Sequence, residues 1–364
     1  MAAAHEMVTL RVHGEDHAEW KRIEITRSLD SFPPGFSLEL ATGTAAPVIR
    51  ADEACEILIG RDLVLTGSVK TVTRTVAGDA KTYSVAGQSK AGTASKNCCT
   101  GDPSEFLGLS INQIASALAT PFGLAVTPAI TGVAQIAKFV PEFGERIYPA
   151  IERLCRGTDL LVTDNPAGDL VLTARGSLRG SDLTPENIKR IEVSCSSADR
   201  YSEYRVYGQR AGDDMVHGAD AAHPWASVLD DDVTDGSLLV LRAEQQADIA
   251  RCKDRATNEA TTRAGRSAVV KITVQGWHDM GVDPPVVLMP NRLRHVIYPD
   301  AGVDAELLVT EVTLRISDTD GIISTMTLMP PGAFELLSPM AQKAKKKKIT
   351  AGFDEWSELD LAGP

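Results

Sequence analysis

The segment from Leu63 to Gln88 constrains the fold of this chain most strongly. It reads LVLTGSVKTVTRTVAGDAKTYSVAGQ, with two β-branched, apolar-rich stretches on either side of the turn signal Ala77-Gly78-Asp79. Two such stretches around a short glycine-containing turn predict a long β-hairpin. A similar layout, LLVTEVTLRISDTDGIISTMTL, occupies Leu307–Leu328, with its turn at residues 318–321.

Short sequence echoes suggest that this hairpin belongs to a duplicated unit. LVLTxxV at Leu63–Val69 matches LLVTEV at Leu307–Val312 to within one residue. A further echo comprises YSVAGQ at Tyr83–Gln88, YRVYGQ at Tyr204–Gln209 and ITVQGW at Ile272–Trp277. We therefore expect two related β-modules in one chain, and chance similarity between short strands is the alternative.

The bulk properties are those of a globular protein with two or three domains. The chain has 364 residues, of which 43% are hydrophobic and 24% charged. A net charge of −12 and a pI near 5.1 argue against a surface that grips nucleic-acid backbone, which needs clustered Lys and Arg. We expect no signal peptide and no membrane span. The cysteines lack metal-ligand spacing and are interpreted as reduced thiols in a cytoplasmic setting: Cys55, Cys98, Cys99, Cys155, Cys195 and Cys252.

Residues 1–100 are predicted to form the first β-module. Alternation of apolar and polar residues marks short strands before the first hairpin. These strands are Val8–Val12, Trp20–Arg27, Phe36–Leu40 and Ala54–Ile59. About six strands with turns between them indicate a barrel or a sandwich.

Residues 101–175 are predicted to form a small α+β domain. Ser110 is placed to cap a helix, with Gln113 at the capping-box position and Pro121 and Gly123 ending it. A short strand, a second helix over 144–156 and a hairpin around 165–169 complete a helix–strand–helix–hairpin unit.

Residues 176–335 are predicted to form the second β-module, followed by a flexible tail at 336–364. Ile188–Val193 and Tyr201–Tyr207 are expected to pair, and residues 211–236 to form a long loop. A helix over 244–264 is expected to end at Gly265. Further strands are expected at 238–242, 269–277, 286–289 and 295–298.

No motif indicates catalysis, so we expect no enzyme, no cofactor and no catalytic, cofactor-binding or metal site. Nucleotide-binding, zinc-protease and serine-hydrolase signatures are absent from the sequence. The weak candidates are interpreted as solvated turns, loops or tails. They are His13, Glu15, Asp16 and His17; Asp318, Asp320 and Gly321; Asp230, Asp231, Asp232 and Asp235; and KAKKKK at 343–348. No triad partner is evident for His217, His223, His278 or His295.

The order of segments over residues 5–335 resembles the baseplate hub proteins of Mu-like contractile-tailed phages, and more broadly the late control protein D and secretion-spike hub families. The matching segments are VTLRVHG…WKRIEITRSLDSFPPGFSLEL, YSVAGQSKAGTASKNCCT, SINQIASALATPFGLAV, IYPAIERLCRGTDLLVTDNPAGDLVLT and LLVTEVTLRISDTDGIISTMTLMPP. The resemblance implies a mainly β, α+β fold with two tube-like β-barrel modules that assemble as a ring.

That resemblance also implies a structural role in the virion. It implies a homotrimer, pseudo-hexameric through two modules per chain, that joins the sixfold tail tube to the threefold central spike and lines the DNA passage. Its implied partners are further copies of itself, the central spike, the tail tube and tape-measure proteins, and the wedge proteins of the baseplate. DNA would pass without sequence-specific binding, the chain would not insert into a membrane, and assembly would occur in the host cytoplasm.

Three alternatives remain at this stage. The first is a tail-associated enzyme that acts on carbohydrate or peptidoglycan, which would need a carboxylate pair at a defined separation. The second is the hub of a contractile secretion-type injection system. The third is a module that binds a host surface or cargo, for which Trp225 and Trp356 could be anchors, whereas Trp20 and Trp277 lie on expected strands.

Overall fold

A computed structural model describes most of the chain and confirms a mainly β, α+β fold. The described residues are 7–40, 48–78, 80–128, 135–155, 160–209, 223–243, 247–317 and 320–334. The predicted tail at 336–364, His217, Trp356 and Asp318 lie outside these ranges.

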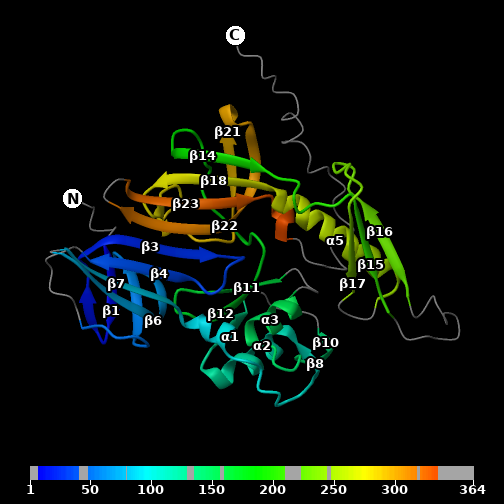
Figure 1. Cartoon of the computed structure of the whole chain (residues 1–364), viewed down its shortest axis with the longest axis horizontal. Coiled ribbons are helices and arrows are strands. Elements are labelled where there is room, and N and C mark those ends of the chain that lie inside the picture. The colour runs from blue at the N-terminus through cyan, green and yellow to red at the C-terminus, as the bar shows by residue number, and fades with distance from the viewer. Residues whose placement is uncertain are drawn as a thin grey trace, which may run out of the picture.

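A single large sheet runs through both halves of the chain (Figure 1). Its strands, in hydrogen-bonded order, are β14 (Ile188–Cys195), β18 (Ala268–Gln275), β23 (Gly321–Met329), β22 (Val303–Ser317), β3 (Trp20–Ser28), β4 (Gly35–Leu40), β7 (Ala80–Ser89), β6 (Asp62–Ala77), β5 (Ala54–Ile59), β1 (Val8–Val12) and β2 (Glu15–His17). β21 (Arg292–Tyr298) pairs with β22 and with β13 (Leu178–Arg179). Among the described residues this order has two ends, so the sheet is open.

Strict alternation along the strands builds the core of this sheet. In β4, Phe36, Leu38 and Leu40 are buried, whereas Ser37 and Glu39 point to the other face. The buried residues of both halves form one continuous apolar cluster that includes Ile25, Val85, Ile272 and Leu314. The two modules therefore share a core.

A small α+β unit follows β7 and has its own apolar core. Its elements are η2 (Lys90–Gly92), α1 (Thr93–Lys96), β8 (Phe106–Ser110), α2 (Ile111–Ala119), η3 (Thr120–Phe122), β9 (Val126–Pro128), β10 (Gln135–Phe139), α3 (Ile147–Cys155), β11 (Leu160–Asp164) and β12 (Leu170–Ala174). The predicted capping box is confirmed. The Gln113 amide donates to Ser110 Oγ at 3.3 Å, and the Ser110 amide donates to Gln113 Oε1 at 2.9 Å.

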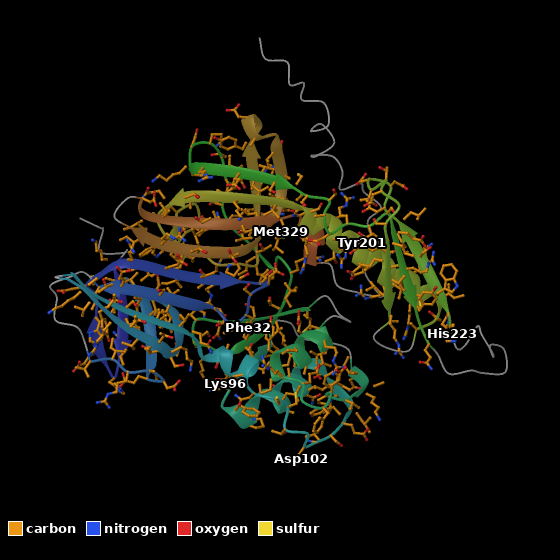
Figure 2. All side chains as sticks on the ribbon, in the orientation of Figure 1. Phe32, Lys96, Asp102, Tyr201, His223 and Met329 are labelled. Atoms are coloured by element: carbon orange, nitrogen blue, oxygen red, sulfur yellow. The ribbon has the colours of Figure 1, made fainter. Side chains whose placement is uncertain are left out.

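A buried ion pair fastens this unit to the sheet. Arg27 on β3 donates from Nη2 to Asp164 Oδ1 on β11 at 2.5 Å, and Ser89 Oγ donates to Asp164 Oδ2 at 2.5 Å. Burial raises the pKa of Asp164, although the charge of Arg27 and the Ser89 hydrogen bond oppose that effect. Phe32, which lies at this contact (Figure 2), stacks on Tyr148 of α3 with ring centroids 4.0 Å apart.

A third unit is inserted between β14 and β18. It consists of β15 (Glu203–Tyr207), β16 (Trp225–Leu229) and β17 (Leu238–Arg242), which pack on α5 (Ile249–Ser267) around a separate small core. The pairing predicted for Ile188–Val193 and Tyr201–Tyr207 is wrong, because β14 pairs with β18 and β15 with β16 and β17. The loop predicted over 211–236 is wrong where β16 lies within it.

The predicted helix end at Gly265 is also wrong, since α5 continues to Ser267. A Cβ at Gly265 would lie 2.3 Å from the amide nitrogen of Ala333 in η5 (Pro331–Phe334). The glycine therefore allows a close approach between segments and does not cap the helix. The remaining described elements are β19 (His278–Asp279), β20 (Val286–Val287) and η4 (Pro299–Ala301).

A second buried ion pair links β21 of the large sheet to β19. Arg294 pairs with Asp279, which also accepts a hydrogen bond from Ser181 Oγ at 2.5 Å. Burial alone would raise the pKa of Asp279. The Ser181 hydrogen bond and the charge of Arg294 outweigh burial, so this pKa is lowered.

The Arg27→Met variant should lower the free energy of unfolding by about 3–5 kcal/mol, because it leaves the Asp164 carboxylate buried without its partner. Urea unfolding of the dilute chain measures the change. Arg22→Met on the same strand is the control. Arg22 is 66% exposed and pairs with Glu39 at 3.4 Å, so its loss should cost at most about 1 kcal/mol. Equal losses for the two variants would contradict the role given to Arg27.

Candidate assembly interface

The two halves of the large sheet repeat the same strand order. The first half runs β3-β4-β7-β6-β5 and the second runs β14-β18-β23-β22-β21, with every neighbouring pair antiparallel. The duplicated hairpin predicted from the sequence is therefore confirmed, with β6 and β7 equivalent to β22 and β23. Three further strands in each half belong to the same repeat.

The first strands of the two halves match residue by residue. Lys21-Arg22-Ile23-Glu24 on β3 and Lys189-Arg190-Ile191-Glu192 on β14 are identical tetrapeptides. Each carries a register shift at the same place, between Trp20 and Arg22 in β3 and between Ile188 and Arg190 in β14. The predicted duplication covered only the hairpins and did not include these strands, although the repeated sequence KRIE marks both of them.

The bulges in the hairpins fix how β6 and β22 correspond. The register shifts between Val69 and Thr71 in β6 and between Val309 and Glu311 in β22, so Lys70 is equivalent to Thr310. The predicted alignment of Leu63–Val69 with Leu307–Val312 is therefore wrong, because it is shifted by three to four residues from the structural equivalence.

The YSVAGQ echo is also wrong as a sign of equivalence. Its three copies lie on β7, β15 and β18, and these strands occupy different positions in the topology.

One joint connects the two modules edge to edge. β22 pairs with β21 up to Leu308 and, beyond its bulge, with β3 from Glu311 to Ile316. The amide of Leu29, just after β3, donates to the carbonyl of the bulge residue Thr310 at 2.8 Å. The edge of β22 thus pairs with β21 before the bulge and with β3 after it.

Side chains on both faces of the sheet stabilise this joint. On the core face, Leu314 lies opposite Ile25, and both are buried. On the other face, Thr313 Oγ1 lies 3.3 Å from Thr26 Oγ1, and Arg315 Nη2 lies 2.7 Å from Glu24 Oε2. Such cross-strand pairs each contribute about 0.2–1 kcal/mol.

Two sheet edges equivalent to those of the joint have no partner among the described residues. β14, the counterpart of β3, pairs only with β18. The stretch of β6 from Lys70 to Ala77, the counterpart of the second half of β22, pairs only with β7. Val76 on this stretch is 69% exposed. Unpaired edges of this length are competent for pairing with another strand.

The face of the sheet opposite the core is rich in hydroxyl groups. Cross-strand registers place the side chains of one row next to one another: Arg190, Thr273, Thr325, Thr313 and Thr26. Two neighbouring rows and the adjoining part of β3 and β4 carry charges that nearly balance. The acids are Glu24, Glu39, Glu192 and Glu311, and the bases are Arg22, Lys271, Arg315, Arg190 from the first row, and Lys189, which donates to Gln275 Oε1 at 2.6 Å. This polar face is therefore close to neutral, despite the net charge of the chain.

The candidate residues from the sequence lie in ordinary surface contacts. His13 lies 3.2 Å from Glu53, His278 3.2 Å from Asp62 and His295 2.8 Å from Asp304. Asp16 accepts from Arg11 at 2.7 Å, which lowers the pKa of Asp16. The structure does not bring these residues together.

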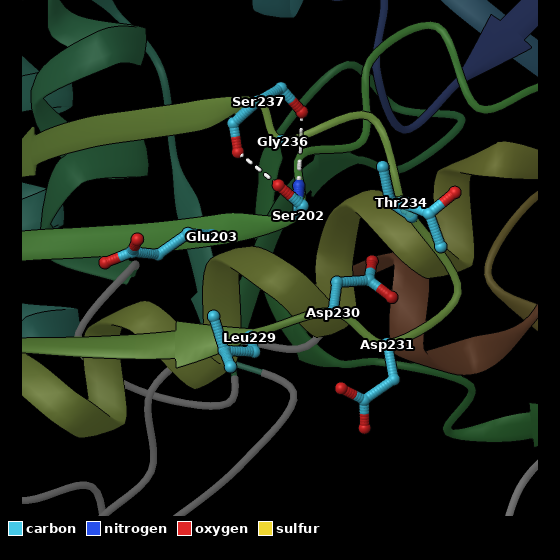
Figure 3. Close-up of a pocket in the computed structure, with 9 residues that line it drawn as sticks. Ser202, Glu203, Leu229, Asp230, Asp231, Thr234, Gly236 and Ser237 are labelled. Atoms are coloured by element: carbon cyan, nitrogen blue, oxygen red, sulfur yellow. Dashed lines mark hydrogen bonds between the residues drawn. The ribbon is translucent and has the colours of Figure 1, made fainter.

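The acidic residues near 230 line a shallow pocket of the inserted unit (Figure 3). Arg200 donates to Asp230 at 2.7 Å and to Asp232 at 2.8 Å, so these two carboxylates are already paired. Ser202 Oγ closes one side by donating to the Ser237 carbonyl at 2.6 Å. Within the described ranges, no group of three or more His, Cys, Asp or Glu side chains could hold a metal ion.

The tryptophans differ in exposure. Trp20 and Trp277 are buried, whereas Trp225 is 49% exposed, with the Arg205 guanidinium 5.2 Å from its ring centroid. In the described part of the chain, no helix combines the length and apolarity needed to cross a membrane.

Three family models match successive parts of the chain. The N-terminal domain of "Mu phage baseplate assembly protein GpP-like" matches residues 7–89, the second domain of "Baseplate hub protein gp44-like" matches 97–174, and the fourth domain of "Mu phage baseplate assembly protein GpP" matches 248–337. Baseplate hub protein gp44 of Escherichia phage Mu is 27% identical over 352 residues, covering 94% of this chain and 92% of its own.

Solved structures of tail proteins share the fold. The 43 kDa tail protein of prophage MuSo2 from Shewanella oneidensis matches with a TM-score of 0.80 and 25% identity, over 91% of this chain and 100% of that one. A tail protein from Neisseria meningitidis matches with a TM-score of 0.77 and 21% identity, over 90% and 97% of the two chains.

These matches, together with the duplicated sheet, define a structural protein of a phage tail. Within that class, the chain belongs to the baseplate hub family of Mu-like phages. It is thus a component of the virion tail baseplate.

The repeated tetrapeptide allows a matched test of the joint. Ile23→Ala should lower the stability of the dilute chain by about 2–5 kcal/mol, because Ile23 is buried and lies opposite Ile316. Ile191→Ala at the equivalent position should cost clearly less, because Ile191 is only half-buried at an unpaired edge. Urea unfolding measures both changes. Equal losses at concentrations where the chain is monomeric would contradict the assignment of β14 as a free edge.

Proposed function

We propose that this chain forms a homotrimeric ring that joins the sixfold tail tube to the threefold central spike. The joint between β22 and β3 carries the proposal, because it links two copies of one module edge to edge while leaving the equivalent edges open. A chain with one such joint and two complementary open edges can repeat the contact head to tail until a ring closes.

Three copies account for both symmetries. Two modules per chain give six similar modules in a trimer, and these can face a sixfold tube. The differences between the modules, such as the unit inserted between β14 and β18, recur three times and can match a threefold spike. We propose module limits of 1–100 and 176–335, with the small α+β domain at 101–175 between them.

We propose that the polar face of the sheet lines a passage for DNA. Threonine hydroxyls and balanced charges would contact a phosphate backbone without the cluster of Lys and Arg that strong binding needs. A strongly acidic wall would repel DNA, whereas a near-neutral wall lets it slide.

The proposed partners follow from this position in the tail. They are the central spike, the tail tube and tape-measure proteins, and the wedge proteins of the baseplate, with assembly in the host cytoplasm. We propose a structural role without catalysis or cofactor, as the sequence predicted.

The purified chain should have a mass near three times 38.9 kDa by light scattering on a sizing column. Negative-stain class averages should show a ring with a central hole, because the six modules surround the passage. The control is the same measurement after stepwise dilution, which should yield monomers without unfolding. A chain that stays monomeric at high concentration, alone and with its cognate spike, would contradict the proposal.

A further inference from the structure

We infer that β14 of one chain pairs antiparallel with the Lys70–Ala77 stretch of β6 in a neighbouring copy, in the register of the joint within the chain. This inference rests on the proposed ring and specifies the contact that closes it. The occupant of both open edges is thus a second copy of this chain.

The register follows from the structural equivalences. The bulges make each residue of β6 equivalent to the residue 240 positions later in β22, since Lys70 corresponds to Thr310. The tetrapeptides make each residue of β3 equivalent to the residue 168 positions later in β14, since Ile23 corresponds to Ile191. Within the chain, Thr313 lies opposite Thr26 and Ile316 opposite Ile23. Between chains, Thr73 therefore lies opposite Ser194 and Val76 opposite Ile191.

The side chains that this register brings together are compatible. Thr73 and Ser194 replace the hydroxyl pair of Thr313 and Thr26 on the polar face. Val76 and Ile191 replace the apolar pair of Ile316 and Ile23 on the core face. A slip by one residue would place the threonines of β6 against the apolar side chains of β14, because side chains alternate between faces.

The open edges themselves favour this pairing over an unrelated partner. From Lys70 onward β6 reads KTVTRTVA, without proline or glycine, and β14 reads IKRIEVSC. Neither contains a break apart from the bulges shared with the joint. The one charge on the core face of the β6 edge is Arg74, which faces Val193 in this register and whose guanidinium lies 5.4 Å from the centroid of the Tyr83 ring. The pairing leaves the hydroxyl-rich face continuous from one chain to the next.

Disulfide cross-linking tests the register. The exposed and half-exposed thiols are first removed as Cys98→Ser, Cys99→Ser and Cys195→Ser. Thr73→Cys and Ser194→Cys are then introduced. Directly opposite residues lie about 4.5–5.5 Å apart between Cα atoms, within the span of a disulfide. Under mild oxidation, the double variant should give covalent dimers and trimers on a denaturing gel.

Three controls test the register of the contact and its head-to-tail direction. Thr26→Cys with Thr313→Cys, the equivalent pair within the chain, should form an intramolecular disulfide and no oligomer. Chains with Thr73→Cys alone and chains with Ser194→Cys alone should cross-link only after mixing, because the contact is head to tail. Thr71→Cys with Ser194→Cys is two residues out of register, at about 7–8 Å, and should cross-link far less.

The outcomes distinguish this inference from the proposed ring. A trimer by light scattering in which only the intramolecular control oxidises would overturn the strand pairing and leave the ring standing. A monomer without cross-links at any concentration, alone and with the cognate spike, would overturn both.

A single substitution gives an independent readout. Val76→Asp should raise the concentration needed for half-assembly by about tenfold or more, since it places a charge against Ile191 without disturbing the exposed site in the monomer. Leu107→Asp, at a position 58% exposed on β8 of the small α+β unit, should leave assembly unchanged. Equal assembly of the two variants would overturn the pairing.

Discussion

The antiparallel pairing of β22 with β3 is the constraint on which the rest of the structure depends. It joins residues nearly 300 positions apart in the sequence, as the contact between Thr26 and Thr313 shows. It merges two modules into one sheet with one core. Because each strand of the joint has an equivalent elsewhere in the chain, the same pairing also defines the two edges left open.

The other units are attached to this sheet by separate means. The small α+β unit has its own apolar core and is fixed by the buried pair of Arg27 and Asp164. The unit of β15 to β17 has a further core and packs on α5. This arrangement lets the sheet keep a repeated geometry, while the attached units differ between the two halves.

Local sequence signals predicted local structure well. Ser110 and Gln113 form the predicted capping box, and the hairpin of β11 and β12 lies where the pattern placed it. Predictions of helix ends and strand pairings that depend on residues distant in the sequence were wrong. Gly265 does not end the helix but lies inside α5, where the backbone of Ala333 comes too close to leave room for a side chain. Ile188–Val193 pairs with β18, which the chain reaches only after a further sheet and a helix.

The sequence by itself determined that the chain is mainly β, that a hairpin recurs near each end and that no familiar catalytic motif is present. These features depend on side-chain periodicity and turn chemistry, which are local. The tertiary structure alone decided the register of the repeat and the identity of the open edges. Strand pairing is a long-range choice made by bulges and shared burial, and short echoes such as YSVAGQ do not encode it.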